Sequence, residues 1–173
     1  MPDASSLDEL ARKSDAVIVA VVESKAWVVR PEKMLAGQKT LPNGNIEVGI
    51  SNPRDYVVGS LYSVRVEQIL KKDHTVRTHR TLRVFVQGFM ASAHEGGAAL
   101  VPGGRYLVFL ERLNLEDGTF SGTKVHKPET KSAKGENFDP KSSYAIVQPG
   151  NGAVQITKKN FEIVRQVKAF LRH

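Results

Sequence analysis

The densest apolar run in the chain covers residues 16–22, Ala-Val-Ile-Val-Ala-Val-Val, and polar residues follow it at once. The run is too short for a good amphipathic helix, has no polar face and is rich in β-branched valine, which is typical of a strand buried on both faces. We expect this strand to continue through residues 26–29, with a bend near residues 24–25. Pairing should stop at Pro31, which has no N–H to donate. Trp27, the single tryptophan, is expected to be a half-buried anchor at the end of the core.

Alternating or nearly continuous apolar residues predict four further strands. They cover residues 56–70, 82–87, 105–111 and 119–126. In the first of them, Tyr62, Val64 and Val66 take the core positions. The alternation then slips, because Gln68 falls at a core position, and a β-bulge or a strand end near residues 67–68 would explain the slip.

Two helices are predicted near the ends of the chain. Ser6 and Glu9 have the spacing of a capping box, so a short helix is expected over residues 7–13. Thr157 is expected to cap a C-terminal helix whose apolar residues recur at three- and four-residue spacing. This stripe consists of Phe161, Val164, Val167, Phe170 and Leu171. We expect it to dock on its own domain rather than on a partner.

The connections between these elements are long. Residues 32–55 form an excursion that carries a weak hairpin around residues 42–45. Residues 88–104 form a second loop, rich in small residues and closed by a Val-Pro-Gly-Gly turn. Loops of this length in a compact domain are usually functional or mobile.

The last third of the chain begins with a polar stretch. Residues 127–143 are rich in lysine and small polar residues, and we expect a solvated, flexible loop in which only Phe138 can be buried. Two short apolar segments, residues 144–147 and 153–156, then flank a Pro-Gly-Asn-Gly turn. They predict a hairpin that precedes the C-terminal helix.

Composition narrows the fold class and removes several chemistries. A chain of 173 residues with 40% hydrophobic and 25% charged residues is typical of one globular domain, here expected to span residues 1–173 with its core in about residues 7–126. No stretch approaches the length of a membrane-spanning helix, so membrane insertion is not expected. Zero cysteines exclude disulfides and thiolate metal sites. The formal net charge of +7 indicates either ordinary solubility or attraction to acidic partners.

Several phrases of the sequence occur in an order that resembles a known family. The strand DAVIVAVVES is followed by YSVRVEQILKKD, LRVFVQG, a glycine-rich loop and GGRYLVFLE. This order resembles the netrin-like and tissue-inhibitor-of-metalloproteinase branch of the OB-fold, together with small exported bacterial domains of that pattern. The resemblance implies a mainly β fold, a partly open five-stranded OB-like Greek-key barrel, to which the short N-terminal and the amphipathic C-terminal helix are added. Independently, about five β segments around one doubly buried strand fit such a barrel.

The same resemblance implies a role in protein binding but not the inhibitory chemistry of the family. There, an N-terminal cysteine chelates the zinc of the target protease, and this chain has no cysteine. Only the scaffold and a general binding role carry over, because a fold does not dictate a function. The resemblance also favours a periplasmic or secreted location. Residues 1–10 have no signal-peptide features, so a leader would be absent from this chain, and a cytoplasmic location stays open.

The sequence shows no recognisable pattern for catalysis or for a cofactor. Its histidines are His74, His79, His94, His126 and His173, and they are scattered through loops and the terminus. A zinc site at His74 and His79 would lack further convincing ligands, and the glycine pairs do not have the spacing of phosphate-binding loops. We therefore expect no enzymatic activity, no bound metal and no cofactor.

A basic connection is the most distinctive polar feature. Its cations are Lys71, Lys72, Arg77, Arg80 and Arg83. Against them stands only Asp73, which leaves a local charge of +4, five cations less one carboxylate. Such a patch can follow phosphates or meet an acidic protein. A nucleic-acid site would also need aromatic rings for stacking, and the nearest are Phe85 and Phe89; a charged loop that discourages edge pairing is the structural alternative.

Two functional hypotheses follow from these observations. The first is a non-catalytic interaction module that binds a protein partner through its long loops, residues 31–55 and 88–104. The second is the binding of single-stranded nucleic acid or another polyanion by the basic residues 71–83. The identity of a protein partner is not encoded in any pattern of the sequence.

Overall fold

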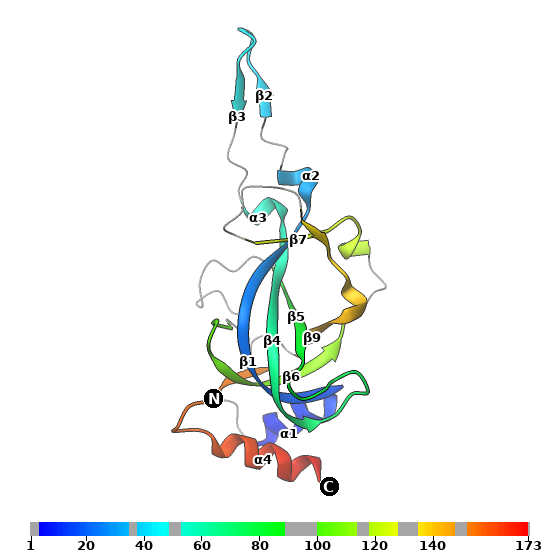
Figure 1. Cartoon of the computed structure of the whole chain (residues 1–173), viewed down its shortest axis with the longest axis vertical. Helices are drawn as coiled ribbons and strands as arrows, with labels where there is room; N and C mark the ends of the chain where they lie inside the picture. The colour runs from blue at the N-terminus through cyan, green and yellow to red at the C-terminus, as the bar shows by residue number, and fades with distance from the viewer. Residues whose placement is uncertain are drawn as a thin grey trace.

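The computed structural model describes residues 4–34, 38–48, 53–88, 100–113, 118–127, 135–147 and 152–172 (Figure 1). The helices are α1 (Ala4–Lys13), α2 (Pro31–Met34), α3 (Pro53–Tyr56) and α4 (Glu162–Leu171), with 3₁₀ turns η1 (Gly118–Phe120) and η2 (Pro140–Ser142). The strands are β1 (Ala16–Val29), β2 (Gln38–Thr40), β3 (Ile46–Val48), β4 (Val57–Lys71), β5 (Thr81–Gln87), β6 (Arg105–Arg112), β7 (Lys124–His126), β8 (Glu136–Asn137), β9 (Ser143–Ile146) and β10 (Ala153–Gln155). The prediction of a mainly β protein is confirmed.

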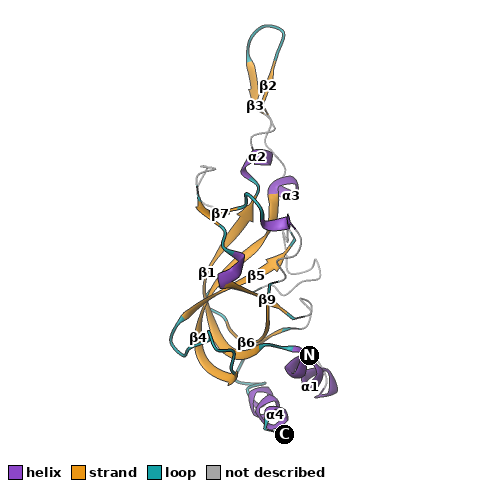
Figure 2. Cartoon of the chain, turned by 90° about the vertical axis from the view of Figure 1, so that its right-hand side faces the viewer, coloured by secondary structure: helices purple, strands orange, loops and turns teal. Residues whose placement is uncertain are grey.

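Five strands close into a ring (Figure 2). Strand β1 pairs with β4, β4 with β5, β5 with β9, β9 with β6, and β6 returns to β1. Every one of these pairs is antiparallel except β5 with β9, which is parallel. Over residues 17–21, β1 therefore has a paired strand on each edge, as its buried backbone N–H and C=O groups require.

The interior of the ring is filled by every second residue of its strands, as the alternation predicts. The predicted core residues Tyr62, Val64 and Val66 are all buried there. Their main partners across the ring are Ile18, Ala20, Val84, Val108, Leu110 and Ile146. Because side chains of a strand point alternately to opposite faces, the intervening residues of β1 and β6 lie outside the ring.

The outer face of β1 and β6 is covered by the two terminal helices. Val17 and Leu107 pack there with Leu10 of α1 and with Val167 of α4. The prediction that β1 is buried on both faces is confirmed, and the reason is now specific: one face lines the ring and the other lies under helices. Docking of α4 on its own domain is confirmed as well.

The strands β1 and β4 are irregular at the places where the sequence pattern slips. Val19 of β1 is opposite Gln68, but the next residue, Ala20, is opposite Val66, so Glu67 is an extra residue in β4. The bulge predicted near residues 67–68 is therefore confirmed. The pairing has three further irregularities, between Val17 and Ile18, between Val22 and Ser24, and between Val28 and Val29; the one at Val22 and Ser24 lies one residue before the predicted bend.

The second half of β1 and the first half of β4 continue together as a ribbon beyond the closed part of the ring, and β5 still pairs with β4 there from Gly59 onward. Strand β7 adds to β1 beside it, and β8 adds to β7. Val28, Leu61, Phe85 and Phe138 form a separate apolar cluster on this side. Trp27 is half-buried, as predicted, with its ring centroid 6.4 Å from that of His126.

The fifth strand of the ring is not the one that the sequence predicts. In residues 119–126, only Lys124–His126 forms a strand, and a 3₁₀ turn precedes it. This strand pairs with the ribbon, whereas β9 closes the ring. In the stretch predicted as a flexible loop, residues 127–143, the described residues 135–143 contain β8 and η2, which the sequence did not predict, and Phe138 is buried as predicted.

The predicted hairpin of residues 144–147 and 153–156 is wrong too. Strands β9 and β10 do not pair with each other; both pair with the same edge of β6, where Ile146 is opposite Leu110 and Ala153 is opposite Val108. The chain therefore runs along β6 in one direction, with an interruption between the two strands. Gly152 permits the close approach at the base of this interruption, since a Cβ there would lie 1.8 Å from the carbonyl oxygen of Val147.

Both terminal helices differ from prediction in detail. Helix α1 begins at Ala4, so Ser6 lies inside it rather than at its cap, and Glu9 pairs with Lys13 at 2.6 Å. Helix α4 begins at Glu162, and Thr157 instead accepts a hydrogen bond from the N–H of Lys159 in the turn before it. Within α4, Val167 is buried as predicted. Phe161 is 49% exposed, and Ile163, which the predicted stripe omits, is buried in its place.

Candidate functional site

The five cations of the predicted basic patch have different environments, and Lys71 has a structural role. Its Nζ donates hydrogen bonds to the carbonyl oxygens of Ala11, Arg12 and Ser14, at 3.1, 3.4 and 2.5 Å. These carbonyls belong to the C-terminal end of α1, where helix carbonyls have no partner within the helix and the dipole favours a positive charge. Lys71 therefore ties β4 to α1.

The remaining cations divide between two places. Arg83 is half-buried on β5 and forms an ion pair with Glu136 of β8 at 3.4 Å. Lys72, Arg77 and Arg80 are exposed in the connection between β4 and β5, and none of them pairs with a carboxylate of the described residues. Only these three cations remain available to an external anion.

The single acid in the basic connection is the centre of a buried polar network. The side chain of Asp73 is only 6% exposed, and its Oδ1 lies 3.0 Å from Arg112 Nη2 at the end of β6. Tyr144 of β9 donates its hydroxyl hydrogen to the other carboxylate oxygen at 3.2 Å, and the N–H of Thr75 donates to Oδ1. His74 lies beside the same carboxylate, with Nδ1 at 3.0 Å.

The network shifts the protonation of its members. Burial by itself raises the pKa of Asp73, but the hydrogen bonds from Arg112 and Thr75 and the nearby positive charge outweigh it, so the pKa lies below its ordinary value. The hydrogen bond to Asp73 raises the pKa of Arg112, and burial raises the pKa of Tyr144. Asp73 is therefore ionised and Tyr144 is neutral near pH 7.

The position of the network explains its role in the fold. Residues 71–80 cross the end of the ring, and Val76 from this connection is buried in the ring interior. Asp73 fixes the connection to the ends of β6 and β9 through Arg112 and Tyr144. The sequence did not indicate this role, and Asp73 entered only as the one negative charge among the five cations. Its partners Arg112 and Tyr144 lie far from it along the chain.

The structure groups no metal ligands among the residues that it describes. His74 and His79 are exposed in the β4–β5 connection, and His126 is buried in β7. His94 and His173 lie outside the described residues.

The described parts of the first predicted binding loop, residues 31–34, 38–48 and 53–55, form a projecting arm. It contains α2, the hairpin of β2 and β3, and α3, and the hairpin lies at the opposite end of the molecule from α1 and α4 (Figure 1). The weak hairpin predicted around residues 42–45 is confirmed. Leu41 N–H donates to Asn45 O at 2.7 Å, and Gly44 supplies the positive φ of the turn. Residues 41–45 are all exposed.

The second predicted binding loop is anchored where the structure describes it. Residues 89–99 lie outside the described residues, but Leu100 is buried in the interior of the ring. The N–H of Val101 donates to the Tyr106 hydroxyl at 3.0 Å, and the N–H of Gly103 donates to Val22 O at 2.8 Å. The C-terminal end of this loop therefore closes one mouth of the ring.

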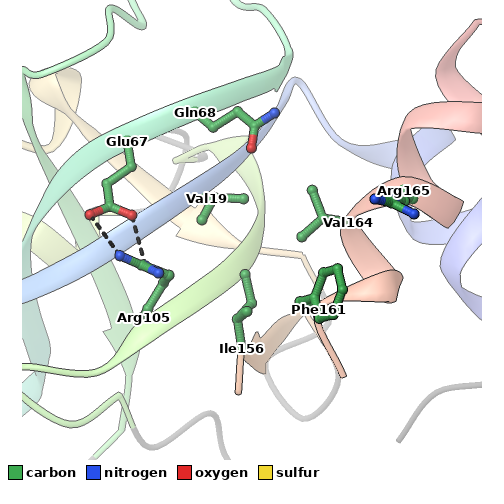
Figure 3. A pocket seen from close by; sticks show the side chains of 8 residues that line it. All are labelled: Val19, Glu67, Gln68, Arg105, Ile156, Phe161, Val164 and Arg165. Carbon is green, nitrogen blue, oxygen red and sulfur yellow. Dashed lines mark hydrogen bonds and ion pairs between the residues drawn. The ribbon is translucent and has the colours of Figure 1, made fainter. Parts of the chain in front are cut away.

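A groove of about 530 Å³ lies between the outer face of the sheet and α4 (Figure 3). Its lining residues are Val19, Glu67, Gln68, Arg105, Ile156, Phe161, Val164 and Arg165. Sequence reasoning did not find this groove. The phase slip at residues 67–68 was its only signal, because the bulge places both Glu67 and Gln68 on the outer face.

Comparison with known proteins identifies no relative of this chain: no family model, curated protein or solved structure matches it. Among the described residues, no helix combines the length and the apolar character needed to cross a bilayer.

Proposed function

We propose that this protein is a non-catalytic module of the OB type that binds another protein through the projecting arm. The observation that carries the proposal is the position of the β2–β3 hairpin, which extends away from the ring with an exposed tip (Figure 1). A periplasmic or secreted location remains part of the proposal and rests on the sequence resemblance.

The order of strands supports the OB-type assignment. An OB-fold is a five-stranded Greek-key barrel, and its ligands are contacted by strands 2 and 3 and by the loops between strands 1 and 2 and between strands 4 and 5. In the ring, β1 and β4 are the first and second strands along the chain, so the arm is the connection between strands 1 and 2. The arm therefore has the place in the fold where such domains present a binding loop.

The physical chemistry of the arm also supports a binding role. A two-stranded hairpin by itself is at best marginally stable in water. The β2–β3 pair forms a separate sheet with three residue pairs, Gln38 with Val48, Lys39 with Glu47 and Thr40 with Ile46. Both of its outer edges are open to pairing within the described residues, and a partner can add a strand to such an edge.

The arm is tested by replacing residues 38–48 with a short glycine–serine linker. We expect the full chain to capture a specific protein from the envelope fraction of its source cells, and the linker variant to lose that protein. The double substitution Lys158→Ala and Lys159→Ala, in the exposed turn before α4, is the matched control and should keep the capture. Equal capture of that protein by the linker variant and the full chain, or no enriched protein with either, would contradict the proposal.

Polyanion binding is the second candidate, favoured by the three exposed cations Lys72, Arg77 and Arg80, which have no ion-pair partner among the described residues. It predicts that a labelled single-stranded oligonucleotide binds at low salt and is released steeply as salt rises. Changing these three residues to alanine should abolish that binding. Lys71 is left unchanged because its substitution would loosen α1. A flat titration at low salt excludes this candidate.

A further inference from the structure

We propose that the groove between the sheet and α4 binds an acidic peptide segment that carries an apolar anchor residue. The groove lies at the helix-covered end of the molecule, away from the arm, so the proposal does not depend on the function of the arm (Figures 1 and 3).

The floor of the groove is apolar and incompletely covered. Val19 from β1, Ile156 from the end of β10 and Val164 from α4 point toward one another across it (Figure 3). Ile156 and Val164 are only half-buried, and Phe161 beside them is 49% exposed. Burial of this surface by an apolar side chain would be favourable, because it removes apolar area from water.

The bulge in β4 shapes the sheet wall of the groove. Without the extra residue, the alternation would direct Gln68 into the ring. With it, Gln68 lies opposite Val19 and faces outward, next to Glu67. An amide and a carboxylate are thus placed beside apolar residues, where they can accept and donate hydrogen bonds at the rim.

The charges of the walls favour an acidic occupant. Arg105 holds Glu67 with two contacts, Nε to Oε2 at 2.8 Å and Nη2 to Oε1 at 3.3 Å, so the only lining carboxylate is already neutralised. Arg165 stands on the helix wall with its side chain 74% exposed; its Nη1 lies 3.4 Å from Glu162, and its guanidinium carbon lies 5.8 Å from the centroid of the Phe161 ring. The charged lining residues are two arginines and one glutamate; Glu162, which pairs with Arg165, lies outside the lining, and Arg165 is mostly in water, so its guanidinium can turn from Glu162 toward a carboxylate in the groove.

The openness of the groove indicates a peptide rather than an enclosed small molecule. Small-molecule sites usually bury most of the surface of their ligand. Here the exposed fractions of Phe161 and Arg165 show that the groove covers an occupant from one side only. A segment of a protein chain is suited to this geometry, because one apolar side chain can enter the floor while its acidic neighbours meet Arg165.

The probe is a fluorescein-labelled decapeptide with two central leucines flanked on both sides by glutamates, titrated with the full chain while fluorescence anisotropy is followed. We expect saturable binding that weakens as salt rises. Serines in place of the leucines should remove the binding, and so should lysines in place of the glutamates. Amide chemical-shift changes on addition of the peptide should concentrate on β4, on β6 and on α4.

Two variants test the walls without disturbing the core. Phe161→Ser removes an exposed aromatic ring that makes no capping hydrogen bond, and binding should weaken about tenfold. Arg165→Glu should weaken the acidic peptide about fivefold and allow the lysine peptide to bind. Arg172→Glu, an equal charge reversal at the end of the same helix, should leave both peptides unaffected.

The opposite outcomes overturn the proposal. They are absence of binding, equal binding of the serine peptide, equal losses for Arg165→Glu and Arg172→Glu, or shift changes confined to the β4–β5 connection. Binding of a medium-chain fatty acid at the same residues, with no binding of the peptide, would also overturn it.

Discussion

Asp73 shows how a single residue can hold the end of a ring of strands together. Its carboxylate accepts hydrogen bonds from Arg112, Tyr144 and Thr75, which come from β6, β9 and the connection that crosses the ring. A buried charge is tolerated when it is paired and hydrogen-bonded, and breaking such a set leaves the other members unsatisfied. The network is therefore better explained as the closure of the ring than as part of an anion site.

Replacement of Asp73 by asparagine should lower the free energy of unfolding by about 1–3 kcal/mol near pH 7. Because the pKa of Asp73 is lowered in the folded protein, its stabilisation is present above the pKa of the unfolded carboxyl, about 4, and is lost as pH falls further. Urea denaturation at pH 6 and at pH 3.5 should show a smaller acid loss for Asp73→Asn than for the natural chain. The exposed residue Asp55 supplies the control substitution Asp55→Asn, and an equal pH response of both variants would contradict the prediction.

At the scale of elements, the terminal helices explain why β1 has no polar face. Helices α1 and α4 contact each other and cover the outer face of β1 and β6. The hydrophobic effect fixes α4 through its two fully buried residues, Ile163 and Val167, whereas Phe161 contributes little to this packing. The same helix therefore has one face that stabilises the fold and one edge that lines the groove.

The two faces of α4 should respond differently to truncation. Ile163→Ala is expected to lower the free energy of unfolding by about 2–4 kcal/mol, because it leaves a cavity against the sheet. Phe161→Ala should cost less than about 1 kcal/mol, because half of that ring is already in water. Thermal and urea unfolding of the two variants provide the measurement. Similar decreases in the free energy of unfolding for both would contradict docking of α4 through Ile163.

The whole molecule divides into a packed ring with its helices and an arm that projects from the ring. The ring interior and the helix layer are two apolar clusters that share β1. The β2–β3 hairpin belongs to a sheet of its own, at the far end of the β1–β4 ribbon (Figure 1). The sequence of such a surface element can change while the core stays intact. Binding loops that are carried by a rigid scaffold have this property.

Removal of the hairpin provides a test at this scale. The chain in which a glycine–serine linker replaces residues 38–48 should keep its far-ultraviolet circular dichroism, and its free energy of unfolding should change by no more than about 0.5 kcal/mol. A loss of several kcal/mol would mean that the hairpin belongs to the folding unit, and the binding test of the arm would then need single substitutions at its tip instead.

Local patterns in the sequence determined most of the ring strands and one of its irregularities. The valine-rich residues 16–22, the core positions of β4 and the bulge at Glu67 could all be predicted, because each depends on the two-residue period of a strand. The turn at Gly44 was also predictable, because a turn depends only on the conformation of neighbouring residues.

Only the tertiary structure decided which strand closes the ring, how Asp73 finds its partners and where the groove lies. Arg112 and Tyr144 are 39 and 71 positions from Asp73 along the chain, and β9 reaches β5 through a parallel pairing that no local pattern specifies. Such contacts depend on how much apolar surface each competing arrangement buries, and that free energy is a property of the whole fold. Residues 119–126 have the pattern of a strand, yet β9 takes the ring position because its alternate residues Tyr144 and Ile146 complete the interior.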